Sequence, residues 1–281
     1  MAHAIADSID SPHSVSRGRA AQVIGTLCWR EWVRFVRQKN RVFGAIGQPA
    51  IFWVLFGAGL GPTFRLPEEQ AASLSYREYF FPGTVILILL FTAIFTTISV
   101  IEDRREGFLQ SVLVAPISRW SMVLGKLVGG GTIALAQGLV FLLIGMTFGL
   151  RFTLLSLVLS VVFLAIAALA LTALGFVFAW RTDSTQGYHA LMSVVLFPMW
   201  LLSGAFFPAA SGWLAWVLAI NPLTYVVAGF RRLLYVGVDH PPLPAELPSM
   251  ATCWTVSLLF AAITFGLSVY VAGRPSSGNL S

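Results

Sequence analysis

The chain has 281 residues, of which 57% are hydrophobic and only 11% are charged. Ordinary soluble proteins carry roughly 25% charged residues, so this composition excludes a typical soluble enzyme or binding domain. The formal net charge of +6 therefore indicates the orientation of a membrane protein and its contact with lipid headgroups, and no nucleic acid is expected as a partner.

The N-terminal region divides into a polar tail and an amphipathic segment. Residues 1–23 lack the apolar core and cleavage site of a signal peptide, and we expect them to form a disordered cytoplasmic tail. Residues 24–40 predict an amphipathic helix in the inner membrane interface, because arginines and tryptophans fall on opposite halves at helical spacing. The alternative is a simple positive flank of the first span. The residues that define this helix are Trp29, Arg30, Trp32, Arg34 and Arg37.

Six segments are candidates for crossing a bilayer, which takes about 20 mostly apolar residues. Five are clear, and a sixth is shorter and contains Pro198. They cover residues 42–61, 80–100, 127–150, 154–179, 190–207 and 251–272. We therefore predict an all-α integral membrane protein with a transmembrane domain over residues 41–272. In the first span, Gln48 and Pro49 indicate either a face turned toward protein or a cavity, or a locally satisfied kink.

The basic residues orient these spans. With the N-terminus inside, most of the 18 Lys and Arg residues lie in the inner segments, as the positive-inside rule requires. We therefore predict a multi-pass protein of the plasma (inner) membrane with both termini cytoplasmic, including a short tail at residues 273–281.

A charged segment separates the second and third spans on the inner side. We predict a short amphipathic helix over residues 102–113, because acidic residues suit the positive end of a helix dipole and proline ends a helix. A solvated turn is the alternative. The residues expected to contact a soluble partner are Glu102, Asp103, Arg104, Arg105, Glu106, Gly107, Phe108, Leu109, Val112, Ala115 and Pro116.

Residues 208–235 lie between the fifth and sixth spans and, by this topology, on the outer side. The apolar stretch 213–220 is too short to cross, so we expect short helices that dip into the outer leaflet and return. The motif residues of this re-entrant region are Asn221, Pro222, Leu223, Thr224, Tyr225 and Arg231.

Three stretches, residues 102–126, 202–208 and 221–232, resemble the membrane subunit of type-2 ABC exporters, a group of drug, lipid and polysaccharide permeases. The resemblance implies a homodimer of permeases with two copies of a separate ATP-binding subunit, which would hold ATP and Mg; this chain would bind no cofactor. It also implies that the helices at 24–40 and 102–113 contact that subunit, the second as the coupling helix. The sequence motif Gly107-Phe108-Leu109 resembles the drug-exporter branch more than the polysaccharide permeases.

We therefore expect a permease that moves an amphipathic or hydrophobic, drug-like or lipid-like substrate outward. The chain has no phosphate-binding loop, so it is expected not to be an enzyme by itself. The alternatives are a polysaccharide or glycolipid permease of the same group, or a passive channel or scaffold. A membrane-embedded enzyme is disfavoured because the four histidines are expected in tails or loops.

Overall fold

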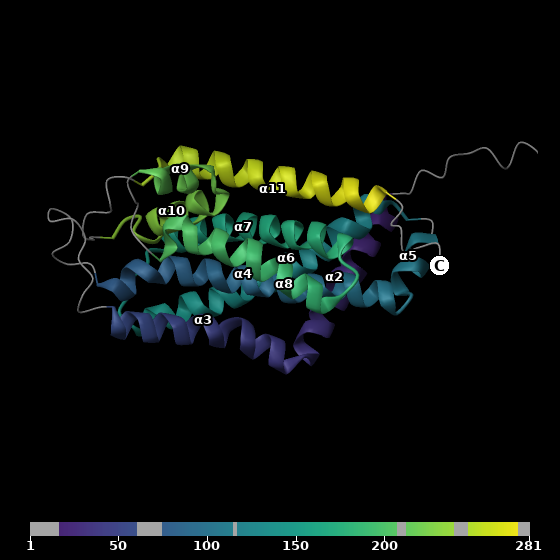
Figure 1. The fold of residues 1–281 in the computed structure, drawn as a ribbon, viewed down its shortest axis with the longest axis horizontal. Helices are drawn as coiled ribbons and strands as arrows, with labels where there is room; N and C mark the ends of the chain where they lie inside the picture. Colours follow the sequence, from purple (N-terminus) through teal and green to yellow (C-terminus); the bar gives the residue numbers. More distant parts are fainter. Residues whose placement is uncertain (1–16, 61–74, 115–116, 207–211, 239–246, 275–281) are drawn as a thin grey trace, which may run out of the picture.

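The computed structural model describes residues 17–60, 75–114, 117–206, 212–238 and 247–274, and within these ranges the protein is a helical bundle without strands (Figure 1). Six helices are long and apolar enough to span a membrane, which confirms the predicted number. They are α3 (Lys39–Gly59), α4 (Tyr76–Arg105), α6 (Arg119–Thr147), α7 (Leu154–Arg181), α8 (Thr185–Trp200) with its π-helical extension η1 (Leu201–Ala205), and α11 (Met250–Gly273).

Helix α4 is the core of the bundle. In the most apolar stretch of α4, 89% of the residues are buried, whereas the corresponding share is 22% in α3 and 28% in α11. Because α4 is apolar on every side between its polar ends, it is stable only where other helices surround it, and α3, α6 and α7 do so. The threonine hydroxyls along α4 donate to backbone carbonyls of the same helix; that of Thr84, for example, donates to the carbonyl of Phe80.

Four further helices lie at the two ends of the bundle. Helices α2 (Arg17–Arg37) and α5 (Phe108–Val114) lie at the end where α11 finishes, and we call this the α5 end (Figure 1). Helices α9 (Trp213–Ile220) and α10 (Pro222–Leu234) lie at the opposite end, the α9 end. The first and last described helices thus approach the same end, as an even number of spans requires.

The predicted single helix over residues 102–113 is wrong. Residues 102–105 form the last turn of α4, and α5 begins only at Phe108. Gly107 separates the two helices with a φ of +75°, and its N–H donates to the carbonyl of Arg104. A glycine in this left-handed conformation is a common helix terminator. Glu102 and Asp103 therefore lie at the negative end of a helix dipole, not at the positive end that we predicted.

The remaining boundaries differ less. Helix α2 begins at Arg17, inside the segment predicted as tail, and α3 begins at Lys39 directly after Gln38. Helices α9 and α10 meet at an angle of 80°, in the region predicted to be re-entrant. Residues 1–16, 115–116, 208–211 and 275–281 carry parts of the predicted tails, of the proline stop and of the re-entrant region, and they lie outside the described residues.

Candidate functional site

Helix α2 packs directly on α6 through two glycines. A Cβ atom at Gly129 would lie 2.9 Å from the Cβ of Glu31 and 3.1 Å from the Cα of Cys28. A Cβ atom at Gly125 would lie 2.9 Å from the Cβ of Leu27. Small residues four apart allow helices to approach closely in this way. The segment predicted as an interfacial helix is therefore attached to the bundle along part of its length.

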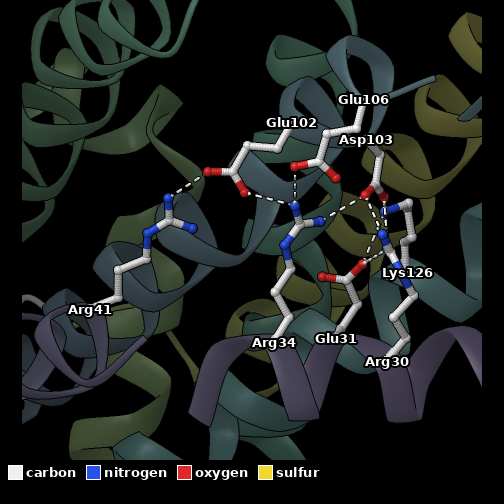
Figure 2. A network of polar contacts seen from close by, with 8 residues as sticks. All are labelled: Arg30, Glu31, Arg34, Arg41, Glu102, Asp103, Glu106 and Lys126. Atoms are coloured by element: carbon white, nitrogen blue, oxygen red, sulfur yellow. Dashed lines mark hydrogen bonds and ion pairs between the residues drawn. The ribbon is translucent and has the colours of Figure 1, made fainter. Parts of the chain in front are cut away.

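Asp103, at the end of α4, is the centre of a buried ion-pair network between α2, α4 and α6 (Figure 2). Its carboxylate is fully buried and accepts two hydrogen bonds from Arg30, at 2.9 and 2.6 Å. It accepts a third from Arg34 at 2.7 Å and a fourth from Lys126 at 2.5 Å. Three cations from two other helices thus converge on one carboxylate.

Three further carboxylates complete the network (Figure 2). Glu31 accepts a hydrogen bond from Lys126 at 2.9 Å, and Glu102 accepts one from Arg41 at 2.7 Å. Arg34 also pairs with Glu102 at 3.1 Å and with Glu106 at 3.5 Å. The eight members carry equal numbers of positive and negative charges: Arg30, Glu31, Arg34, Arg41, Glu102, Asp103, Glu106 and Lys126. We call this set the charge network.

Electrostatics explain why cations surround the carboxylates at the end of α4. The last turn of a helix carries a partial negative charge, which makes two carboxylates there unfavourable unless cations surround them. Burial adds a desolvation cost that only well-formed hydrogen bonds offset. The pKa of Arg30 is raised above its ordinary value, chiefly by its hydrogen bonds with the Asp103 carboxylate, so this guanidinium remains charged.

Helix α5 is attached to the charge network on one side only. The guanidinium of Arg30 lies 3.8 Å from the centre of the Phe108 ring, and Leu109 is buried. Val112 is half-buried, whereas Gln110 and Ser111 are exposed and Val114 is 86% exposed. The exposed residues form a surface at the end of the molecule, which we call the α5 surface.

The two arginines that end α4 hold the turn after α7. Arg104 donates to the carbonyl of Trp180 and pairs with Asp183 at 3.2 Å. Arg105 donates to the backbone carbonyl of Asp183 at 2.9 Å. Glu102, Asp103, Arg104 and Arg105 were expected to meet a soluble partner, but the structure gives each of them partners within the chain.

The predicted faces of α2 are reversed in part. Arg30 and Arg34 turn toward the protein, because the buried carboxylates of the charge network need counter-charges. Trp29 is 71% exposed, Arg37 is exposed, and Trp32 donates from its indole nitrogen to the hydroxyl of Thr132 at 3.0 Å. Sequence reasoning missed Glu31 and Lys126. The sequence did contain a signal for Lys126, because a charged residue at the start of a membrane span costs free energy unless it is paired and therefore indicates a partner nearby.

At the α9 end, the break in α8 leaves backbone carbonyls without helical partners. Asn221 donates to the carbonyls of Met199 and Leu202, at 2.5 and 2.9 Å, while its side-chain oxygen caps α10 by accepting from Leu223. Arg231 donates to the carbonyls of Tyr79 and Gly204. Irregular backbone at this depth requires such replacement partners. These motif residues therefore join α10 to α8 and α4.

The other motif residues lie in the first turn of α10. Pro222 occupies the start of the helix, where its missing N–H costs nothing. Leu223 is buried, and the Tyr225 hydroxyl donates to the carbonyl of Ala219 at 2.8 Å. Thr224 lines a cavity.

A second cavity, of about 390 Å³, lies between α3, α4 and α8. Phenylalanines at positions 52, 91, 95 and 197 form much of its wall, together with Gln48, His189 and Ser193. Gln48 lines this cavity, in agreement with the first of the two alternatives for this span, although its side chain is exposed in the single chain. The expectation that every histidine lies in a tail or loop is wrong, because His189 belongs to the first turns of α8.

Comparison with known proteins places these features in a family. The model of the family described as ABC-2 type transporter matches residues 22–235. The chain is 26% identical to the putative transport permease ycf38 of Cyanophora paradoxa, over 75% of this chain and 74% of the relative. It is 27% identical to the probable doxorubicin resistance ABC transporter permease protein DrrC of Mycobacterium tuberculosis, over 80% and 79% of the two chains.

A shorter match covers part of a third relative. The chain is 28% identical to the probable multidrug ABC transporter permease YbhR of Escherichia coli, over 54% of this chain and 42% of that protein. The residues matched by the family model run from α2 to the end of α10, so they include both the charge network and the α9 end. The chain therefore belongs to the ABC-2 type transporter family of membrane proteins.

Proposed function

We propose that this chain is the transmembrane permease subunit of an ATP-driven exporter, powered by a separate ATP-binding subunit. The family membership and the six apolar helices support a transport role, and two relatives are named as drug-related ABC permeases. The observation that carries the proposal is the α5 surface. A short helix packs on one side against Arg30 of the charge network, while Gln110, Ser111 and Val114 on its other side are exposed.

The α5 surface is suited to receive force from a soluble partner. A push on α5 acts on Arg30, which stacks on Phe108 and hydrogen-bonds Asp103. Through Asp103 and Lys126 the same network joins α2, α4 and α6. Packed and charged networks shift between discrete arrangements more readily than they deform. We propose that ATP-driven closure of the partner moves these helices as one block.

In this proposal the charges of the network have a different role from the one that the sequence suggested. Glu102, Asp103 and Arg104 transmit force within the chain, and the exposed Gln110, Ser111 and Val114 meet the ATP-binding subunit. Arg105 and Glu106 are exposed and lie beside α5. They would influence which partner is accepted more than how tightly it binds.

We propose that the substrate path includes the cavity between α3, α4 and α8. Its aromatic wall suits an apolar or amphipathic molecule, and Gln48 and His189 would be costly if they faced lipid hydrocarbon. A second copy of this chain against the same face would enclose the cavity and shield both side chains. We place the α5 end in the cytoplasm, where ATP is available, and propose outward transport from the likeness to the doxorubicin resistance permease.

The test is reconstitution with an ATP-binding subunit, which is first sought in an adjacent reading frame that encodes a phosphate-binding loop. The two proteins are co-purified and placed in proteoliposomes, and ATP hydrolysis and ATP-dependent transport are measured across drugs, lipids and glycolipids. Stimulation by drug-like or lipid-like compounds is expected, whereas stimulation only by glycolipids would favour the polysaccharide and glycolipid alternative. Flux without the partner or ATP would contradict the proposal and support a passive channel.

A matched pair of variants tests the α5 surface. Val114→Lys places a charge on this surface, and Gln186→Lys places the same charge on an exposed position at the start of α8, at the same end of the bundle. We expect Val114→Lys to lose most substrate-stimulated ATP hydrolysis and Gln186→Lys to retain it. Equal activity of the two variants would exclude α5 as the docking element while leaving the permease assignment intact.

A further inference from the structure

Arg231 is a buried cation without an acidic partner among the described residues. It is 3% exposed, and one of its terminal nitrogens, Nη2, donates to the carbonyls of Tyr79 and Gly204 at 3.1 and 3.2 Å. Its Nε atom is buried and has no hydrogen-bond partner within the described part of the chain. Carbonyls and an aromatic ring 4.1 Å away stabilise the charge without neutralising it. A buried positive charge with a free donor favours an anion.

Arg231 lines a partly open cavity of about 310 Å³, whose other walls come from α9, α10 and η1, from Tyr79 of α4 and from the residues before α11. Thr224, Ala228 and Arg231 all line it, because these positions recur on one face of α10 at helical spacing. The hydroxyl of Thr224 is also buried and has no hydrogen-bond partner in the described residues. Arg231 and Thr224 thus line the same space, and each carries a buried donor without a partner among the described residues.

The other polar hydroxyls of the cavity already have partners. The Tyr79 hydroxyl donates to the carbonyl of Gly204 at 3.0 Å, the Tyr225 hydroxyl to that of Ala219, and the Ser203 hydroxyl to that of Trp200. The groups of the cavity residues that lack hydrogen-bond partners in the described part of the chain are therefore donors. Phosphate and carboxylate groups are the acceptor-rich ligands that arginine recognises best.

The opposite wall is apolar and is supplied by α9. Ala215, Leu218 and Ala219 line the cavity, whereas Trp213 and Trp216 on the other face are 75% and 74% exposed. Exposed tryptophans beside a membrane bundle are typical of the interface between hydrocarbon and headgroups. A ligand entering here would bring a polar head to that depth with an alkyl chain attached.

We propose that this cavity, between Arg231, Thr224 and the inner face of α9, is a binding site for an amphiphile with a phosphate or carboxylate head. On binding, small rotations of the two side chains bring Nε of Arg231 and the hydroxyl of Thr224, both buried in the ligand-free protein, to the anionic head, which accepts a hydrogen bond from each. The first part of the alkyl chain packs on Ala215 and Leu218. This goes beyond the proposed export function, because it concerns ligand binding by the chain alone, without an ATP-binding subunit or transport.

The experiment measures ligand-dependent thermal stabilisation of the purified full chain in a non-ionic detergent. The probes are decyl phosphate, decyl phosphocholine with the same chain and a zwitterionic head, decanoate, and inorganic phosphate. A ligand that binds only the folded state raises the melting temperature in a saturable way. We expect decyl phosphate and decanoate to do so, decyl phosphocholine to act at least tenfold more weakly, and inorganic phosphate to bind weakly.

Thr224→Val is the decisive variant, because it keeps the shape of the side chain and removes a hydroxyl that makes no hydrogen bond in the ligand-free protein. We expect unchanged or slightly higher stability without ligand, and roughly threefold to tenfold weaker binding of decyl phosphate, as the loss of one hydrogen bond predicts. Arg231→Lys, which keeps the charge but loses Nε, should weaken binding further.

Three results would each overturn the assignment. The first is the absence of saturable stabilisation by decyl phosphate and decanoate. The second is equal stabilisation by decyl phosphocholine, or by inorganic phosphate alone, which would identify a detergent-like pocket or a small-anion site. The third is Thr224→Val binding decyl phosphate as the unaltered chain does, which would leave Arg231 with only its role at the carbonyls of Tyr79 and Gly204.

Discussion

Replacing Asp103 by asparagine removes the central charge of the charge network and almost nothing else. The carboxylate is fully buried and accepts four hydrogen bonds from three cations, at 2.5 to 2.9 Å. Asparagine has the same shape and keeps one accepting oxygen, but its NH2 group cannot accept from the cations that it faces. The eight-residue network then changes from neutral to a net charge of +1. Removing one partner of a buried ion pair costs about 3–5 kcal/mol of folding free energy.

The assay is thermal unfolding of the purified chain in detergent, combined with hydrogen exchange of α2. Asp103→Asn should lower the melting temperature and increase exchange over residues 17–37, because Arg30 and Arg34 hold this helix against α4. The control is Asp183→Asn, the same substitution at a carboxylate that is 93% exposed, and it should change little because exposed ion pairs contribute little.

A second variant separates charge from packing. Asp103→Asn combined with Lys126→Met makes the network neutral again and should recover part of the lost stability. The reasoning is refuted if Asp103→Asn behaves like Asp183→Asn, or if α2 exchanges no faster while the protein loses stability elsewhere.

Three other changes test separate parts of the structure. Gly129→Leu inserts a side chain where even a single added Cβ atom would lie 2.9 Å from the Cβ of Glu31. It should lower the free energy of unfolding by about 1–3 kcal/mol, measured by thermal unfolding. An unchanged melting temperature would contradict the close contact between α2 and α6. Asn221→Ala removes a helix cap and two hydrogen bonds to freed carbonyls, a loss of about 2 kcal/mol in the same assay. Asn221→Asp keeps the cap but turns an acceptor toward those two carbonyls, so it should lose at least as much, and an Asp variant as stable as the unaltered chain would refute this role. Gln48→Leu should leave unfolding unchanged but alter which compounds stimulate ATP hydrolysis by the complex; an unaltered substrate profile would remove Gln48 from the proposed path.

The membrane-spanning part of the fold could be predicted from the sequence because it depends on local composition. Long apolar runs identify spans by themselves, and all six have counterparts among the helices. The shorter fifth span was recognisable despite Pro198, although its end is a π-helical turn rather than a regular helix. Which face of each span is buried did not follow from composition, since α4 and α11 are both apolar throughout but differ greatly in burial.

The charge network could not be predicted because it depends on contacts between distant residues. Arg30 and Asp103 are 73 positions apart, and the pattern of α2 alone suggested that its arginines face lipid headgroups. The glycine at position 107 was visible, but the sequence did not show that it takes a positive φ and ends α4 there. That single conformation moves Glu102 and Asp103 from the expected start of one helix to the end of another.

In the proposed function, α5 receives force from an ATP-binding subunit on the inner side. Its most direct test is a cysteine at the exposed position Ser111, with its native Cys28 and Cys253 replaced by serine, in cells that produce both proteins. We predict a disulfide cross-link between Ser111→Cys and a cysteine in the groove of the ATP-binding subunit, with a yield that changes when ATP is bound, and protection from impermeant thiol reagents outside intact cells. Modification of Ser111→Cys by such a reagent from the outside would contradict both the orientation and the proposed coupling.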